Sequence, residues 1–345
     1  MAVVESVPSA GPNQWHPEVE PSPIGPDWRD SIGWVPHVPT PPELAAGVAA
    51  GAWARAAAPV IGPVLLRGLG QMMGGERMPR RADHEIPNLG DPGWFGPESA
   101  TWRVHSDSSM MVSGFTAFAL QTLHPRALAG VIEHSAFGED FMGRTQRTGE
   151  YVMQVSFGDS DTAARYTAML PRVHASVTGI GPDGRPYDAN EPELLDFVHA
   201  TQFVATASAH QRFGARPLDR AGLDRYIAEN ARVGRAVGVV SPPESWDEAL
   251  AALDRHRARL AIGEAASEGL RYLADPPFLP APARPIWRVL HTGALASLPP
   301  FARRLMGLGR PNPADLAACR ALVRAFGALL PTSPLVDEAH RRARG

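Results

Sequence analysis

The sequence predicts an all-α fold, and three observations support this prediction. Apolar residues recur at helical spacing in one segment after another. No convincing run of alternating apolar and polar residues indicates a strand. The 35 prolines and 33 glycines are expected mostly in arms, turns and helix ends. With 44% apolar and 20% charged residues among 345, the chain has the composition of a soluble globular protein.

The first element is a proline-rich arm over residues 1–42. It contains ten prolines and shows neither helical nor alternating periodicity. It also contains Trp15, Trp28 and Trp34, and large aromatic residues are scarce in disordered tails. We therefore expect an extended arm that packs on the body of the protein.

The next segment, residues 43–69, is rich in alanine and other apolar residues, but arginines and prolines interrupt it. A membrane-spanning helix needs about 20 uninterrupted apolar residues. Two buried or interfacial helices are therefore the favoured interpretation, and membrane contact is the alternative. A polar, glycine-rich stretch follows over residues 74–96.

Three helices are predicted after this stretch. Residues 110–123 are apolar on almost every side, which predicts a central helix. Proline is suited to the first turn of a helix, so a second helix is expected over residues 125–133. Residues 159–177 follow a 3.6-residue period, with a kink expected at Pro171.

A turn is expected between this helix and the next. Residues 179–187 match G-x-G-x-x-G by letter, but no helix opens there, so we do not interpret them as a dinucleotide site. Asn190 resembles an N-cap with Glu193 three residues later. The helix that follows is expected to place Val198 and His199 toward the core.

Helices are also predicted in the rest of the chain. Residues 218–237 form a helix that ends near Gly238, and two overlapping capping boxes precede a helix over 249–262. A proline-rich loop is expected over 276–285. The last predicted helices cover residues 296–304 and 313–330.

Composition excludes several functions. The net charge of −3 gives no general attraction to nucleic acid or to an anionic membrane. All 33 basic residues are arginine, so no Schiff-base, P-loop or kinase lysine is available. The single cysteine, Cys319, excludes an intramolecular disulfide, a four-cysteine iron–sulfur site and c-type haem attachment. Residues 1–6 have neither a basic end nor an apolar run, so we expect no secretory signal and a cytoplasmic protein.

Histidine is the abundant residue type suited to chemistry near neutral pH. Six of the twelve have polar, proline or arginine neighbours and are expected to be solvated: His16, His37, His84, His105, His256 and His340. The other six lie in or beside apolar segments: His124, His134, His174, His199, His210 and His291. A single buried histidine is usually a packed core residue, whereas a cluster would indicate chemistry.

A second group of polar residues lies at helical spacing. Arg144, Thr148 and Tyr151 would share one stripe of a helix, with a solvated face as the alternative. The motifs H-E-x-x-H and G-x-S-x-G are absent, as are the E-x-x-H pairs of di-iron bundles. A lone histidine on an apolar helix suits haem iron, which needs one protein donor beneath a hydrophobic cleft.

Short landmarks over residues 108–254 carry a resemblance to a known family. They are Leu123-His124-Pro125, His134-Ser135-Ala136-Phe137, Arg144 to Thr148 with Tyr151, Phe157-Gly158 with Ala163-Ala164, Arg172 to Gly179, Gly184 with Tyr187-Asp188-Ala189, and Phe197-Val198-His199-Ala200. In this order and spacing, the chain resembles the catalytic domain shared by the endoplasmic-reticulum-bound MpaB oxygenase and the latex-clearing rubber oxygenases.

The resemblance implies a globin-like multi-helix bundle around a buried pocket for haem b. It implies that His174 is the proximal iron ligand and that Arg144 and Thr148 lie near the haem. The rubber oxygenases have a distal lysine where this chain has Arg147, which cannot bind iron as a neutral amine. Their distal glutamate has no counterpart at matching spacing, so cleavage of polyisoprene is not expected.

We therefore predict a haem b-dependent oxygenase that acts on a hydrophobic small molecule with dioxygen or peroxide and without nucleic acid. His199 is a reserve candidate for contact with His174 or with the distal pocket. Two alternatives stay open: a non-haem metal or cofactor-free enzyme that uses His124, His134, His174 and His199, and a membrane-associated lipid- or haem-binding protein without catalysis. The predicted division is an arm (1–42), apolar helices with a connecting loop (43–107), a catalytic core (108–265) and C-terminal helices (266–345).

Overall fold

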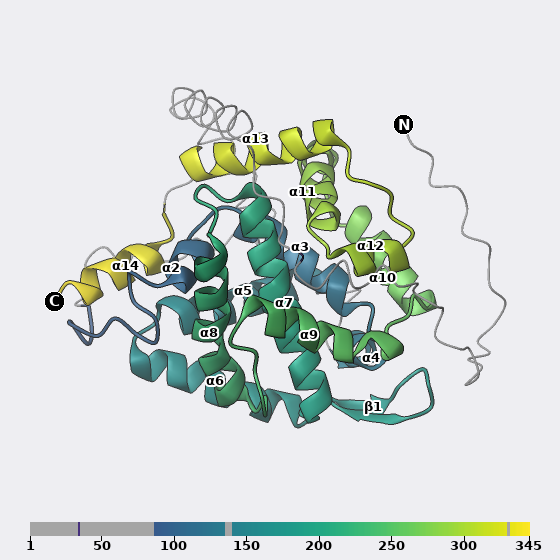
Figure 1. Cartoon of the computed structure of the whole chain (residues 1–345), viewed down its shortest axis with the longest axis horizontal. Coiled ribbons are helices and arrows are strands. Elements are labelled where there is room, and N and C mark those ends of the chain that lie inside the picture. The colour runs from purple at the N-terminus through teal and green to yellow at the C-terminus, as the bar shows by residue number, and fades with distance from the viewer. Residues whose placement is uncertain (1–33, 35–85, 135–139, 330–331) are drawn as a thin grey trace.

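A computed structural model describes residue 34 and residues 86–134, 140–329 and 332–345. Helices make up most of this described chain, and one short two-stranded sheet accompanies them (Figure 1). The all-α prediction is confirmed. The apolar helices predicted in 43–69, and the arm over 1–42 apart from Trp34, lie outside the described residues. The predicted division into four segments stays a prediction.

The central pair of helices is α3 (Met110–Gln121) and α7 (Pro192–Phe213), which pack closely on each other. They run antiparallel, because Ser109 lies beside His210 at one end and the His124 ring lies 4.9 Å from the Phe197 ring at the other. Helix α7 is buried on almost every side. A helix this apolar all round belongs in the interior.

Further helices cover the central pair. On one side α7 contacts α8 (Arg220–Val237) and α9 (Trp246–Arg255), and α3 packs against α11 (Arg284–Ala296). Helix α11 in turn packs against α13 (Pro313–Leu329), which lies across the end of the bundle (Figure 1). The shorter elements of the C-terminal part are η2 (Arg257–Arg259), α10 (Glu264–Ala274), η3 (Ala281–Ala283) and α12 (Pro300–Leu305).

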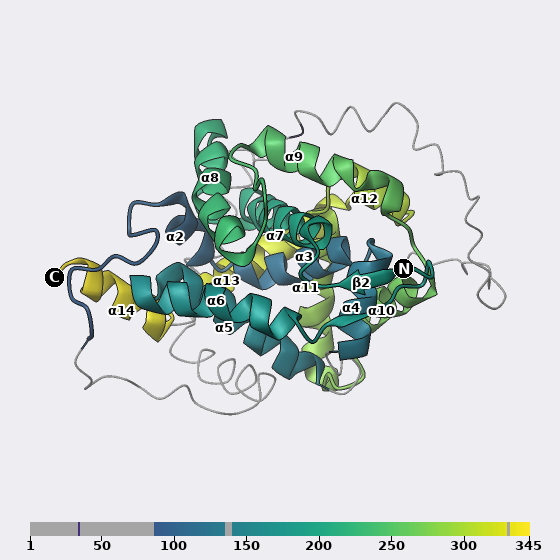
Figure 2. The same cartoon turned by 90° about the horizontal axis from the view of Figure 1, so that it is seen from below.

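Another layer is the helical hairpin of α5 (Phe141–Phe157) and α6 (Ser160–His174). Figure 2 shows the two helices side by side along one edge of the molecule. Helices α2 (Ala100–His105) and α14 (Pro334–Ala343) pack on α5, and α8 packs on α6. The antiparallel strands β1 (Thr178–Ile180) and β2 (Pro186–Asp188) pair Gly179 with Tyr187 and contact α4 (Pro125–His134).

Several predicted elements are confirmed with close boundaries. These are α3, α4, α6, α8 and α13, and α8 ends at Gly238, whose φ of +101° is a conformation suited to glycine. The predicted stripe of Arg144, Thr148 and Tyr151 lies on a helix, since all three belong to α5.

Other predictions need correction. Residues 179–187 contain a short hairpin instead of a turn alone. It was not predicted, because strands of three residues are too short to show an alternation of apolar and polar residues. Asn190 is not the N-cap of α7; Glu191 takes that position, and the Asn190 amide donates to the Pro171 carbonyl at 3.0 Å. Val198 is 38% exposed and does not face the core.

Boundaries in the C-terminal half also differ from the predictions. Helix α9 ends at Arg255 and not at residue 262, since Ala261 N–H donates to the Leu123 carbonyl at 2.9 Å. Adjacent prolines separate α11 from α12 where one helix over 296–304 was predicted. The sequence reading missed four helices: α2, α10, α11 over most of its length, and α14.

Trp34 bears out the expected packing of the arm at one point. Its carbonyl accepts a hydrogen bond of 2.6 Å from the indole N–H of Trp246, and the two rings lie 5.9 Å apart. In the part of the chain that the structure describes, no helix combines the length and the apolar character that a bilayer-spanning segment needs.

Candidate functional site

The α5–α6 hairpin positions the residues that the sequence singled out. Asp159 caps α6 by accepting a 2.7 Å bond from Thr162 N–H, and Tyr166 O–H donates to Glu150 across the hairpin at 2.7 Å. Because the helices are antiparallel, the first turns of α5 lie beside the last turns of α6. Arg144 and His174 therefore occupy the same end of the hairpin.

His174 belongs to the inward stripe of α6. Ala163 and Thr167 on this stripe are buried, and Leu170 packs against a cluster of α7 and α8 residues. The imidazole is half-buried, and its Nδ1 is buried with no hydrogen-bond partner among the described residues. Burial lowers the pKa of His174, although Asp188 and Asn190 act in the opposite direction. The ring is thus a neutral imidazole near pH 7, which is the form that binds metals.

Asn190 is the polar group that faces His174. Its amide nitrogen is fixed on the Pro171 carbonyl, while its Oδ1 is buried without a partner in the described chain. Its side chain raises the pKa of His174 through a hydrogen-bonding contact. An amide oxygen without a donor beside an imidazole nitrogen without an acceptor is suited to accept the Nδ1–H of His174.

Arg144 and Tyr151 supply polar groups on α5. Burial lowers the pKa of the Arg144 guanidinium, with a further contribution from Arg147, and no described carboxylate pairs with it. The Tyr151 hydroxyl is buried and unpartnered among the described residues, and burial raises its pKa. Thr148 lies between Arg144 and Tyr151 along α5, and its side chain is exposed. A partly buried cation that has no counterion among the described residues is suited to bind an anionic group.

Exposed glycines lie in the middle of α3 and of α5. Gly114 belongs to the central helix α3, yet it is exposed, and among the described residues no atom beyond its chain neighbours and its own helix backbone lies within 4 Å of the place where a Cβ would stand. The same is true of Gly149 on α5. The two helices meet at one end, where the Phe118 and Phe141 rings lie 6.4 Å apart.

His199 takes a packed position between α7 and α8. It is buried, and its ring lies 4.7 Å from Phe203. A Cβ on Gly234 would come within 2.8 Å of the His199 ring, so glycine allows the close approach. Burial lowers the pKa of His199 to about 4. Its role as a reserve site residue stays a prediction.

A different group of residues meets at the first turn of α7. His124 precedes α4, Glu193 lies in the first turn of α7, and His256 is the C-cap of α9. The nitrogen and oxygen atoms that they offer lie within 4.8 Å of one another. Both histidines are almost completely buried, with side-chain exposures of 1% and 4%. We refer to these three residues as the His-Glu-His cluster.

Three histidines have a different exposure from the one predicted. His256 and His105 were expected to be solvated, but both are buried. His105 lies between Ser156 Oγ at 2.7 Å and Tyr226 Oη at 2.9 Å, and burial followed by the charge of His210 lowers its pKa to about 3. His134, expected in an apolar setting, is exposed. His124 shares the cluster with neither His134, His174 nor His199.

Glu193 and Asp196 were not recognised from the sequence as partners of histidines. They lie three residues apart on α7, so they share one face. Burial alone would raise the pKa of Asp196, but its hydrogen bonds to His256 and Arg255 hold the pKa below the usual value. Two carboxylates one turn apart are the only local signal that could have identified this position.

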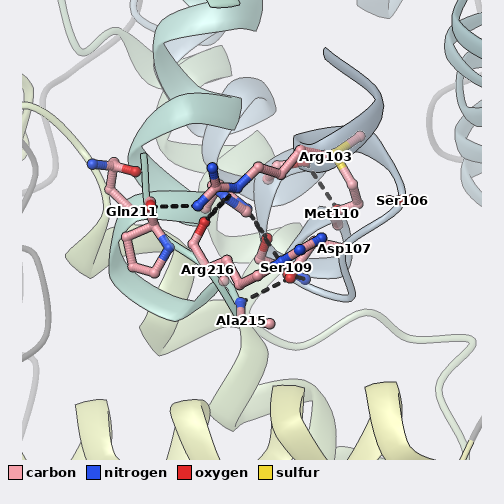
Figure 3. A network of polar contacts seen from close by, with 12 residues as sticks. Arg103, Ser106, Asp107, Ser109, Met110, Gln211, Ala215 and Arg216 are labelled. Carbon is pink, nitrogen blue, oxygen red and sulfur yellow. Dashed lines mark hydrogen bonds and ion pairs between the residues drawn. The ribbon is translucent and has the colours of Figure 1, made fainter. Parts of the chain in front are cut away.

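A dense polar network holds the opposite end of α7. Figure 3 shows Asp107 accepting from the backbone N–H groups of Ser109 and Ala215, both at 2.8 Å. Arg103 donates to the carbonyl of Arg216 at 3.0 Å. The buried Gln211 donates to the Leu218 carbonyl at 2.8 Å and accepts from the Leu218 N–H at 2.7 Å. These bonds fix the loop after α7 against the loop before α3.

Comparison with known proteins gives one match. Residues 102–328 match the family model described as the catalytic domain of ER-bound oxygenase mpaB/B'/Rubber oxygenase. This range contains the α5–α6 hairpin, the His-Glu-His cluster and the central pair of helices. No curated protein and no solved structure matches the chain.

Proposed function

The chain belongs to the ER-bound oxygenase mpaB and rubber oxygenase catalytic-domain family, and on this premise we propose that it is a haem b-dependent oxygenase acting on a hydrophobic small molecule. Membership of the family supports an oxidoreductase of the oxygenase type. Haem dependence, the residues that hold haem and the class of substrate form the proposal. The observation that carries it is the half-buried imidazole of His174, which lies at the same end of the hairpin as Arg144, a guanidinium that pairs with no carboxylate of the described residues.

The donor set fits haem. Haem b is held by one neutral imidazole as iron ligand and by a cation for its propionates, and His174 and Arg144 would supply both. Haem, when bound, supplies an iron centre that activates dioxygen or peroxide. His174 would bind through Nε2, and its buried Nδ1 would donate to Asn190.

The other residues take supporting roles. Arg144 would bind a propionate or compensate negative charge on oxygen, and Thr148 would donate a hydrogen bond from the exposed part of α5. Asn190 would accept the Nδ1–H of His174 and so fix the orientation of the ring. Tyr151 offers a protonated hydroxyl, since burial raises its pKa above the ordinary value.

Absorption and electron paramagnetic resonance spectra of the purified full chain test the proposal. The wild type should show a Soret band and the spin signature of an imidazole-ligated haem iron. His174→Ala should lose the axial signature, and added imidazole should restore it. His134→Ala is the matched control, because His134 is exposed and bonds only to the Thr178 carbonyl among the described residues. An unchanged axial signature in His174→Ala would reassign the ligand, and a wild type without a Soret band would overturn haem dependence.

The role of Asn190 has its own readout. Asn190→Ala should retain haem but raise the reduction potential, because the axial imidazole loses its hydrogen-bond acceptor. Asn190→Asp, with a charged acceptor, should lower the potential. Equal potentials in both variants would show that Asn190 does not contact the ligand.

A further inference from the structure

Three polar atoms in the His-Glu-His cluster are buried and make no hydrogen bond in the described chain, although one of them, Glu193 Oε1, has the Arg259 guanidinium as an ion-pair partner. They are Nε2 of His124, Oε1 of Glu193 and Nδ1 of His256. Buried polar atoms are nearly always paired in native proteins, so each orphan needs an explanation. Here two imidazole nitrogens without a partner and one carboxylate oxygen come from three separate segments of the chain, and all three atoms lie within 4.8 Å of one another. A single bound cation would satisfy all three.

The chemistry of the donors selects the kind of cation. Two imidazole nitrogens and one carboxylate oxygen suit a divalent first-row transition metal, of which zinc is the common example. Calcium and magnesium prefer oxygen ligands alone. Three protein donors leave one position for water, and Glu193 is the most exposed of the three, with a side-chain exposure of 29%.

Asp196 orients one of the two imidazoles. His256 Nε2–H donates to Asp196 Oδ2 at 2.9 Å. With the ring proton on Nε2, the lone pair of Nδ1 points to the cluster. A carboxylate that holds the far nitrogen of a histidine is the usual support of a metal-binding imidazole, because it fixes both tautomer and orientation.

Two arginines form ion pairs with Glu193. Arg259 Nε lies 2.8 Å from Oε1, and Arg126 donates to Oε2 at 3.2 Å. Arg259 is about half exposed, so its guanidinium can turn into water and release Oε1. Arg126 is more buried and can keep its bond to the other oxygen. Arg259 therefore competes with a cation for the carboxylate.

The second imidazole needs one proton shift. Nδ1 of His124 accepts a long bond of 3.4 Å from the Ala127 N–H. Binding through Nε2 places the ring proton on Nδ1, so this long bond is given up. The α4 helix loses one capping contact and gains a metal bond at the same side chain.

We propose that His124, Glu193 and His256 form a binding site for one divalent transition-metal ion, distinct from the haem site proposed at His174. Its ligands come from the beginning of α4, the first turn of α7 and the end of α9. An ion here would join these three elements.

Zinc binding to the full-length chain tests this site. Protein stripped with a chelator and then freed of it is titrated with Zn²⁺ in a calorimeter, and bound zinc is counted by mass spectrometry. We expect one equivalent per chain. His124→Gln, His256→Gln and Glu193→Gln should each weaken this binding at least tenfold. His134→Gln, on the exposed part of α4, should leave zinc binding unchanged. Zinc binding should also be the same whether or not the sample shows the haem absorption band.

Arg259→Ala gives an independent test that leaves all three ligands in place. Removing the competing guanidinium should tighten zinc binding several-fold. Equal zinc affinity in the wild type and His256→Gln would overturn the site, as would an equal loss in His134→Gln. Affinity in Arg259→Ala at or below that of the wild type would overturn Glu193 as a ligand.

Discussion

The two ends of helix α7 treat buried polar groups in opposite ways. At its C-terminal end, Gln211 uses both ends of its amide, and His210 contacts the Arg216 carbonyl at 3.1 Å and Ser109 Oγ at 3.4 Å. At its N-terminal end, the His-Glu-His cluster buries two imidazole nitrogens without a partner in the described chain and one carboxylate oxygen whose partner is the half-exposed Arg259 guanidinium. The polar groups at one end of α7 are therefore hydrogen-bonded within the protein, whereas those at the other end are free to bind a ligand.

The difference indicates that one end of α7 contributes mainly to stability and the other to ligand binding. A satisfied buried network contributes to stability, because removing one partner strands the other in an apolar setting. Unsatisfied buried groups cost free energy in the unliganded protein and are retained where a ligand uses them. Mutations at the two ends of α7 should therefore have different effects.

The largest effect is expected for Gln211→Leu. It leaves both the N–H and the carbonyl of Leu218 buried and unpaired, which should lower the free energy of unfolding by about 2–4 kcal/mol. Glu193→Gln at the other end should cost only about 1 kcal/mol or less, since its ion pairs are partly exposed. Urea unfolding followed by circular dichroism measures both. Equal losses would break the comparison.

The next effect concerns metal. If the cluster binds zinc only in the folded state, zinc at one hundred times its dissociation constant should stabilise the protein by about 2.7 kcal/mol. His256→Gln should abolish this stabilisation, whereas His210→Gln should retain it at a lower starting stability. Thermal melts at matched zinc concentrations provide the measurement. Stabilisation that persists in His256→Gln would place the zinc elsewhere.

Acid should reveal the buried histidines. The folded-state pKa of His105 is about 3, below its ordinary value of 6.5, so the unfolded chain binds the proton first. Stability is therefore complete above pH 6.5 and falls as the pH drops toward 3, by about 1.4 kcal/mol per pH unit for this one residue. His105→Gln should reduce that slope by the same amount, whatever its stability at pH 7. An unchanged slope between pH 5 and 4 would show that His105 does not contribute.

The smallest effect is expected for His256→Leu without metal. It removes an orphaned nitrogen together with the bond from Nε2 to Asp196, which keeps its bonds to Arg255 at 3.2 and 3.0 Å, so stability should change by about 1 kcal/mol or less. The matched variant His210→Leu leaves the Arg216 carbonyl without its ring partner and should cost about 1–3 kcal/mol. Chemical denaturation of the pair distinguishes them. A larger loss in His256→Leu would contradict the view of an unsatisfied end.

Apolar content and helical spacing predicted several of the helices. Helices α3 and α8 were found because their apolar residues are numerous and their ends carry turn residues such as Gly238. Helix α11 was missed because its beginning reads as a proline-rich loop, and α2 because six residues give too short a pattern. Tertiary contacts, such as the bond from Ala261 to Leu123, decide where α9 must end.

The candidate site was predictable only in part. Arg144, Thr148 and His174 came from the family resemblance, and the helix that carries the first two is confirmed. The His-Glu-His cluster could not be found, because its residues come from three distant segments. Arginine neighbours suggested a solvated His256, yet burial depends on which face meets α7, and local composition does not report that.

The contact between Trp34 and Trp246 gives the molecule an internal optical reporter. Two indole rings 5.9 Å apart and inclined at 38° couple their excited states, so the near-ultraviolet circular dichroism should carry a signal specific to this pair. Trp246 begins the same helix that ends beside His256. Loss of that signal in Trp34→Phe would assign it to this pair of rings. Following the same signal during zinc titration of the wild type would then show whether zinc binding at one end of α9 changes the other end.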